Sequence, residues 1–142
     1  DQVQGVIAEG GCFCGAVRYR GVLLSSRVHG CHCSDCRRVS GAPFLAWTDF
    51  DPDQFEFTTG SPGTYAALND AGARTLRHFC KDCGTQMTYR RPDEVEAVWV
   101  TIGSLDEPGE LTPGEHIWTG SRLDWVLLDD RWPQHEGGFP GD

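Results

Sequence analysis

Residues 10–15 read Gly-Gly-Cys-Phe-Cys-Gly, and they decide the fold because they place two thiols close together near the start of the chain. Residues 79–84 read Phe-Cys-Lys-Asp-Cys-Gly and supply a second pair. Cys-x2-Cys is an established zinc-ligand spacing, and a structural zinc site takes four ligands in a tetrahedron. We therefore expect the two pairs to form one closed four-sulfur site that ties the N-terminal strand to a distant hairpin. Its predicted ligands are Cys12, Cys14, Cys80 and Cys83.

Two backbone devices would bring these sulfurs together. In an extended segment, residues two positions apart point to the same face, so Cys12 and Cys14 would point one way and Phe13 the other. Between Cys80 and Cys83 a tight turn is expected, and the glycine that follows can take the positive φ such turns often need. A closed shell leaves no position for substrate, so this zinc is predicted to be structural and to stabilise the folded state.

A third group, residues 31–36, reads Cys-His-Cys-Ser-Asp-Cys. It offers three sulfurs to one point, from Cys31, Cys33 and Cys36. Three protein ligands with one open position distinguish a catalytic zinc from a structural one. We therefore predict a second, catalytic zinc ion here, with these three cysteines as the catalytic residues.

The alternative for this central group is a fourth protein ligand that closes the shell. The candidates are His29, His78 and His116. His32 is a poorer candidate, because a residue between two ligands of an extended Cys-x-Cys projects away from the metal. It is expected to be a hydrogen-bonded neighbour of the site.

The grouping of the cysteines favours metal over disulfides. The chain has seven cysteines, an odd number, and all fall in these three clusters. Disulfide partners need only meet in space and have no reason to lie one or two residues apart. A redox protein that forms disulfides within the central group remains an alternative, which exposed thiols of low pKa would support.

A zinc ion held by three thiolates is an electron-rich, weak Lewis acid. It is better suited to holding a soft incoming sulfur as a thiolate than to making hydroxide. A small-molecule thiol is therefore the expected substrate class. An anionic thiol would need cations nearby, and Arg37 and Arg38 directly follow Cys36. The alternative for these arginines is a solvated surface pair.

Length and charge set the remaining limits. The chain has 142 residues, which predicts one domain over residues 1–142. Its formal net charge of −9 repels phosphate backbones and anionic lipids, so neither nucleic acid nor a membrane is an expected partner. No apolar run approaches the roughly 20 residues of a membrane helix. The N-terminus lacks the layout of a secretion signal, which favours a cytoplasmic protein.

Short apolar stretches separated by glycine and proline predict a mainly β fold with little helix. Residues 34–39 are expected to form one helical turn capped by Ser34 or Asp35. Residues 105–114 are expected to be a turn-rich connector, and residues 115–132 a lid or edge across the sheets. Strands are expected at 15–21, at 22–29 antiparallel to it, and at 44–50, 55–59, 63–68, 75–79, 85–90 and 95–102.

The order of the motifs resembles one known family. The motifs are GGCFCGAVRY at 10–19, CHCSDCRR at 31–38 with Ser-Gly at 40–41, FCKDCGT at 79–85, and HIW at 116–118 with Trp-Pro downstream. Together they resemble the glutathione-dependent formaldehyde-activating family over nearly the whole chain. The resemblance implies a β-tent of short antiparallel sheets. It also implies a structural zinc on the first and last cysteine pairs and a second zinc on the central three.

The activity that this resemblance implies is addition of glutathione to formaldehyde, giving S-hydroxymethylglutathione, in a family classed with carbon–sulfur lyases. A thiol and an aldehyde are then the expected partners. His32, Asp35 and His116 are candidate proton donors for the alkoxide that forms. The family shares its domain with centromere protein V, so a non-catalytic, zinc-stapled binding or scaffold module is the competing hypothesis.

Overall fold

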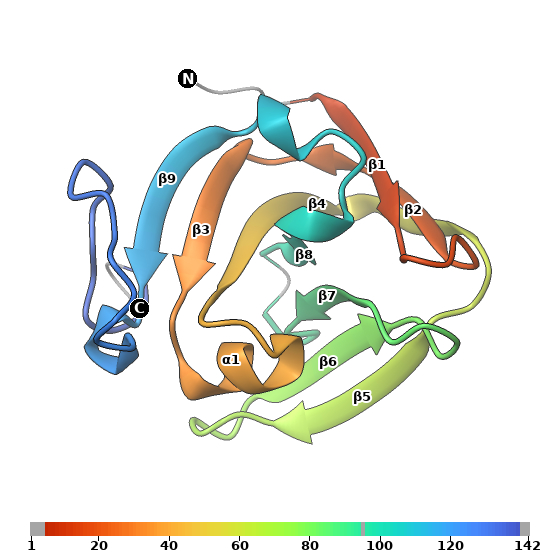
Figure 1. Ribbon diagram of the computed structural model, residues 1–142. Helices are drawn as coiled ribbons and strands as arrows, with labels where there is room; N and C mark the ends of the chain where they lie inside the picture. Colours follow the sequence, from red (N-terminus) through yellow and green to blue (C-terminus); the bar gives the residue numbers. More distant parts are fainter. Residues whose placement is uncertain (1–4, 95, 140–142) are drawn as a thin grey trace.

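The computed structural model describes residues 5–94 and 96–139. These two ranges contain nine strands, one α-helix, α1 at Ser34–Ser40, and three 3-10 helices, η1 Ile102–Ser104, η2 Pro108–Glu110 and η3 Thr119–Ser121 (Figure 1). No helix in these two ranges is both long and apolar enough to cross a bilayer. The strands are β1 Ile7–Gly11, β2 Arg18–Leu23, β3 Arg27–Cys31, β4 Leu45–Thr59, β5 Gly63–Leu68, β6 Arg74–Phe79, β7 Gln86–Arg90, β8 Val98–Thr101 and β9 Thr112–Ile117.

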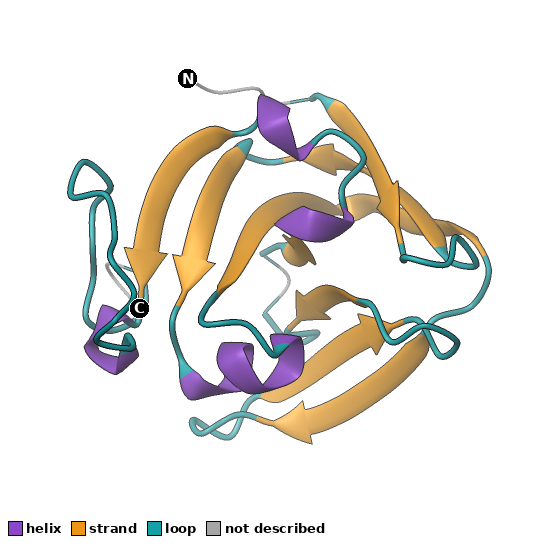
Figure 2. Ribbon diagram, in the orientation of Figure 1, coloured by secondary structure: helices purple, strands orange, loops and turns teal. Residues whose placement is uncertain are grey.

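One curved sheet contains all these strands. Its hydrogen-bonded order is β1-β2-β4-β8-β7-β6-β5, and β3 branches from β4 to pair with β9. The pairs are antiparallel except for β3 with β9, which is parallel. Figures 1 and 2 show how strongly the sheet bends, so that the β1–β2 and β6–β7 ends face each other. The mainly β class is confirmed, and the curvature lets turns far apart in the sequence meet.

The segment 44–59 corrects the prediction of two separate strands. It is one continuous strand, β4, of 15 residues, and Asp51-Pro52 does not end it. The pairing of β2 with β4 shifts register between Gly21, which faces Phe55, and Leu23, which faces Phe50, so Pro52 lies within a bulge of β4. A bulge leaves local backbone groups unpaired, so a residue without an N–H is tolerated there.

A second correction concerns residues 22–29. This segment was expected to pair with the preceding strand, but β3 pairs with β4 and β9. Ser26 takes a positive φ of 59° at the bend before β3, and this redirects the chain.

Residues 105–114 were expected to be a turn-rich connector and residues 115–132 a lid or edge. This prediction is wrong in part, because β9 spans Thr112–Ile117. The Thr-Pro-Gly-Glu sequence of β9 is typical of a turn, and only its long-range partner makes it a strand.

The core has two parts. The larger one contains Tyr19, Phe50, Met87 and Val100, each at most 1% exposed. Tyr19 also hydrogen-bonds the hydroxyl of Ser104 at 2.6 Å, which satisfies a buried phenol. The smaller part surrounds the central cysteines.

A close approach at Gly10 gives a first prediction. A Cβ at Gly10 would overlap the carbonyl oxygen of Ser104 and the hydroxyl of Tyr19, whereas one at Gly103 would meet nothing within 4 Å. We expect Gly10→Ala to lower the free energy of unfolding by about 2–4 kcal/mol and Gly103→Ala to change it by less than about 0.5 kcal/mol. Urea denaturation measures both. Equal stability of the two variants would contradict the packing at Gly10.

Candidate metal centres

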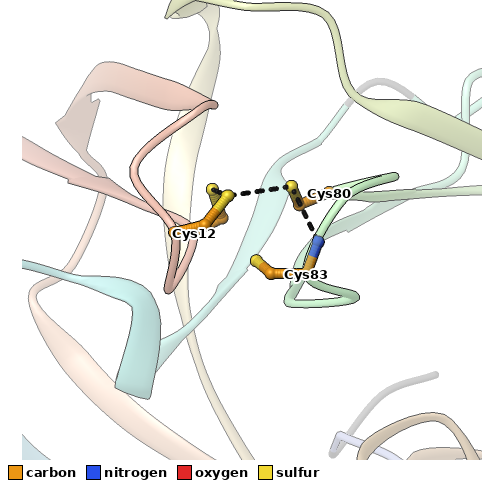
Figure 3. A group of neighbouring side chains, drawn as sticks. Cys12, Cys80 and Cys83 are labelled. Carbon is orange, nitrogen blue, oxygen red and sulfur yellow. Dashed lines mark hydrogen bonds between the residues drawn. The ribbon is translucent and has the colours of Figure 1, made fainter.

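The first and last cysteine pairs meet at two turns. Cys12 and Cys14 lie in the turn between β1 and β2, and Cys80 and Cys83 lie in the turn between β6 and β7. Their four sulfurs lie within 4.8 Å of one another. In Figure 3 the labelled side chains of Cys12, Cys80 and Cys83 point toward one another from the two turns.

The sulfur spacing tests whether zinc fits between them. A tetrahedron with zinc–sulfur bonds of about 2.3 Å has sulfur–sulfur edges of roughly 3.8 Å. The Sγ atoms of Cys12 and Cys14 are 3.7 Å apart, and those of Cys14 and Cys80 are 3.8 Å apart. The four-cysteine group therefore has the size and the ligand chemistry of a structural zinc site.

Backbone amides orient two of these sulfurs. The Val17 amide donates to Cys12 Sγ at 3.2 Å, and the Cys83 amide donates to Cys80 Sγ at 3.4 Å. Gly84 has a φ of 82°, and its amide closes the turn on the Cys80 carbonyl. N–H donors of this kind favour the thiolate form that metals bind.

The local geometry of the first pair differs from the expectation. Residues 12–15 form a turn closed by the Gly15 amide on the Cys12 carbonyl, so this segment is not extended. Phe13 nevertheless points away and is 94% exposed. The turn reaches the same result as the predicted strand, because both place the two sulfurs on one side.

The central cysteines converge at the start of α1. Cys31 ends β3, Cys33 is the N-cap of α1, and Cys36 lies buried in its first turn. The three sulfurs lie within 4.8 Å of one another. The Sγ atoms of Cys31 and Cys33 are 3.4 Å apart. The Cys36 amide donates to Cys33 Sγ at 3.3 Å, so the sulfur fills the capping role that was expected of Ser34 or Asp35.

The pKa values of the trio's thiols shift in opposite directions. The hydrogen bond from Cys31 is the largest cause that lowers the pKa of Cys33, to about 2, and the same contact raises the pKa of Cys31. The contacts within the trio therefore favour the thiolate form of Cys33. A thiolate is the form in which cysteine binds metal.

The histidines considered as fourth ligands all lie elsewhere. Among the described residues, the trio's group of possible ligands contains neither histidine nor carboxylate. His78 pairs with the Thr88 hydroxyl at 3.1 Å. His29 faces Glu115 at 3.3 Å. His116 Nδ1 lies 3.0 Å from His32 Nε2.

His32 is fully buried beside the trio, as expected of a neighbour rather than a ligand. Its ring stacks on Phe44 with centroids 4.5 Å apart. Burial lowers the pKa of His32 to about 4 and also lowers that of His116. The two histidines are therefore neutral at pH 7. Asp35, the third proton-donor candidate, is exposed.

The two arginines that follow Cys36 lie in different environments. Arg37 Nη1 donates to the carbonyls of His32 and Ser121 at 3.0 and 2.9 Å. It therefore ties the trio's loop to the C-terminal segment. Arg38 is exposed in the last turn of α1.

Sequence reasoning missed the aromatic surroundings of the trio. Trp47 is buried with the cysteines, and Tyr89, Trp99 and Phe139 pack against this cluster. Trp99 stacks on Phe139, with centroids 5.5 Å apart. The register pairs Tyr89 with Trp99, and Trp47 with Thr101. Strand alternation alone could not have revealed this, because it does not say which strands are neighbours.

Comparison with known proteins adds three likenesses. An "uncharacterized lyase" of Schizosaccharomyces pombe is 30% identical over 81 residues, which are 57% of this chain and 56% of that protein, little more than half its length. A "putative glutathione-dependent formaldehyde-activating enzyme" of Halomonas elongata is 28% identical over 131 residues, covering 89% of this chain and 83% of the relative.

The third likeness is to a crystal structure of a Rhodobacter sphaeroides protein. It has a TM-score of 0.57 and 22% identity over 74% of this chain and 97% of that one, so it supports the fold alone. The family described as "Glutathione-dependent formaldehyde-activating enzyme" matches residues 7–121. Because this match spans most of the chain and includes both cysteine clusters, the protein belongs to the glutathione-dependent formaldehyde-activating enzyme family.

Proposed function

We propose that the protein is a zinc-dependent carbon–sulfur lyase that adds a small thiol such as glutathione to formaldehyde or a related aldehyde. The observation that carries this proposal is the difference between the two clusters. One cluster gathers four sulfurs and the other gathers three. Among the described residues, no histidine or carboxylate joins the three as a fourth ligand. The names of the family and of its relatives support the same chemistry.

The residues that would hold the two zinc ions follow from this difference. Cys12, Cys14, Cys80 and Cys83 would hold a structural ion, and the trio would hold a catalytic one. When bound at the trio, zinc would keep an incoming thiol in its nucleophilic thiolate form at neutral pH.

The chain's own residues supply position and environment. Cys33 and Cys36 are fixed by the first turn of α1, and Cys31 is fixed by the pairing of β3 with β4. Trp47 and Tyr89 line this side of the sheet with apolar rings, which restrict water around the reacting atoms. In the reaction the thiol sulfur forms a bond to the carbonyl carbon. The carbonyl oxygen takes the electron pair and then a proton, giving a thiohemiacetal.

The test is the rate of thiohemiacetal formation from glutathione and formaldehyde, followed by NMR exchange spectroscopy. We expect a rate well above the uncatalysed one with the zinc-loaded protein, lost on dialysis against a chelator and restored by zinc. A rate equal to the uncatalysed reaction across several thiols and aldehydes would defeat the proposal.

A further inference from the structure

Three strands of the sheet, β1, β5 and β9, have only one strand neighbour each. Other segments of the chain cover two of these edges. On β1, the Asp106 amide donates to the Glu9 carbonyl at 3.0 Å. On β9, the His116 amide donates to the Pro133 carbonyl and the His135 amide donates to the His116 carbonyl, both at 2.9 Å. In the described part of the chain, the backbone partners of β5 all belong to β6, so the outer edge of β5 is left uncovered.

The strand β5 also lacks the features that keep an edge from pairing with another strand. Natural edge strands are protected by charged side chains, proline, bulges or short length. The sequence of β5, Gly-Thr-Tyr-Ala-Ala-Leu, contains neither a charge nor a proline. All six residues pair with β6 without a register shift, so the strand has no bulge. Figure 1 shows β5 as the outermost strand along the lower margin of the sheet.

Apolar side chains accompany this open edge. Tyr65 is 61% exposed and Leu68 is 69% exposed, and they lie on opposite faces of the strand because side chains alternate. A strand added beside β5 would cover part of both side chains and would pair the free backbone groups. The edge therefore offers hydrogen bonds and apolar contact together, which is how a sheet takes up a further strand.

The charge around β5 indicates what that strand belongs to. The chain has a net charge of −9, so two copies repel each other over most of their surfaces. The β5–β6 hairpin, residues 63–79, is an exception, because it contains two arginines and only one acidic residue, Asp70. Two copies can therefore approach through this hairpin without bringing acidic surfaces together.

The residues of β5 also complement one another in an antiparallel pair. A twofold axis through the middle of the exposed run 64–68 passes at Ala66. Each Tyr65 would then face an Ala67, and each Leu68 would face a Thr64. Every large side chain is opposite a small one, and no like charges are opposed, which is the arrangement that stabilises cross-strand pairs.

We propose that two copies of this chain form a dimer by antiparallel pairing of β5 with β5 about a twofold axis at Ala66. The two sheets would then become one continuous sheet, and the interface would be the same patch on both copies. One strand from each copy buries less than the roughly 800 Å² per partner of a standard interface, so we expect a dissociation constant of about 1–100 µM. This inference does not depend on the proposed function.

The test is sedimentation velocity over about 1–500 µM protein, with reversed charges at the axis. Ala66 is exposed, so Ala66→Lys and Ala66→Glu should both fold. In either variant alone, two like charges would lie about 5 Å apart at their Cβ atoms, and the dissociation constant should rise at least about tenfold. An equimolar mixture of the two variants should dimerise again, because opposite charges then meet. Ala71→Lys makes the same change at an exposed alanine in the turn after β5 and should dimerise as wild type does.

A second measurement uses the wild-type protein alone. Hydrogen exchange of the amides at 64–68 should slow as the concentration rises through the dissociation constant, whereas exchange in β1 should not change. A wild-type protein that stays monomeric at about 500 µM would overturn the proposal, and this is the result expected if β5 instead binds a strand of a different protein. Dimers that persist in both charge variants alone, or a mixture that stays monomeric, would also overturn the pairing at Ala66.

Discussion

The Cys83→Ser protein is expected to lose one of two zinc ions per chain and most of its folding stability. The four-sulfur cluster joins the β1–β2 turn to the β6–β7 turn, and Cys14 and Cys80 are 66 residues apart. In the sheet order, β4, β8 and β7 lie between β2 and β6. The cluster therefore joins the two ends of the bent sheet, which face each other in Figure 1.

The size of the effect follows from the coupling of metal binding to folding. Structural zinc in small peptides binds with roughly 10–16 kcal/mol, whereas whole domains are stable by about 5–15 kcal/mol. Replacing one thiolate by a hydroxyl forfeits a large part of the first quantity. We expect a fall in melting temperature of more than about 20 °C, because a change of 1 kcal/mol moves a domain of this size by several degrees.

Thermal melts by circular dichroism, with metal analysis of the same samples, measure this prediction. Lys81→Ala is the matched control, since Lys81 lies exposed in the same turn, and it should keep both zinc ions and the wild-type melting temperature. A Cys83→Ser protein that melts with wild type would show that this cluster does not hold the fold together.

The cysteine clusters could be predicted from sequence because spacing within a few residues decides which sulfurs point to one place. The structure brings the sulfurs of the two pairs together and those of the trio together, as expected; the joining of the two pairs, which are 66 residues apart, followed from the four ligands of a closed zinc shell. Strands with local partners, such as β5 and β6, were also predictable from alternation and turn residues. These features depend on contacts that the chain makes with its near neighbours.

Features that depend on distant partners could not be predicted. β9 became a strand only because β3 lies alongside it, and Gly114 permits that approach, since a Cβ there would overlap the Val28 carbonyl oxygen. The place of Arg77 above Tyr89 needs the pairing of β6 with β7.

The Cys36→Ser protein is expected to fold, to hold one zinc ion fewer than wild type, and to lose its activity. The trio lies within six residues, 31–36, so a metal there closes only a short loop and removes little entropy from the unfolded chain. The strands beside it have partners of their own, because β3 pairs with both β4 and β9. We expect the melting temperature to fall by no more than about 5–8 °C, a loss of roughly 1–2 kcal/mol.

Activity should respond far more strongly than stability. A vacated trio can no longer hold the thiol as its thiolate, so kcat/KM for glutathione and formaldehyde should fall by about a thousandfold or more, equivalent to roughly 4 kcal/mol of transition-state stabilisation. Ser34→Ala, an exposed neighbour on α1, should retain both metal and rate. If both ions were structural, Cys36→Ser would instead unfold as completely as Cys83→Ser. Melts and zinc content of the two variants, measured side by side, therefore separate an enzyme from a zinc-stapled scaffold.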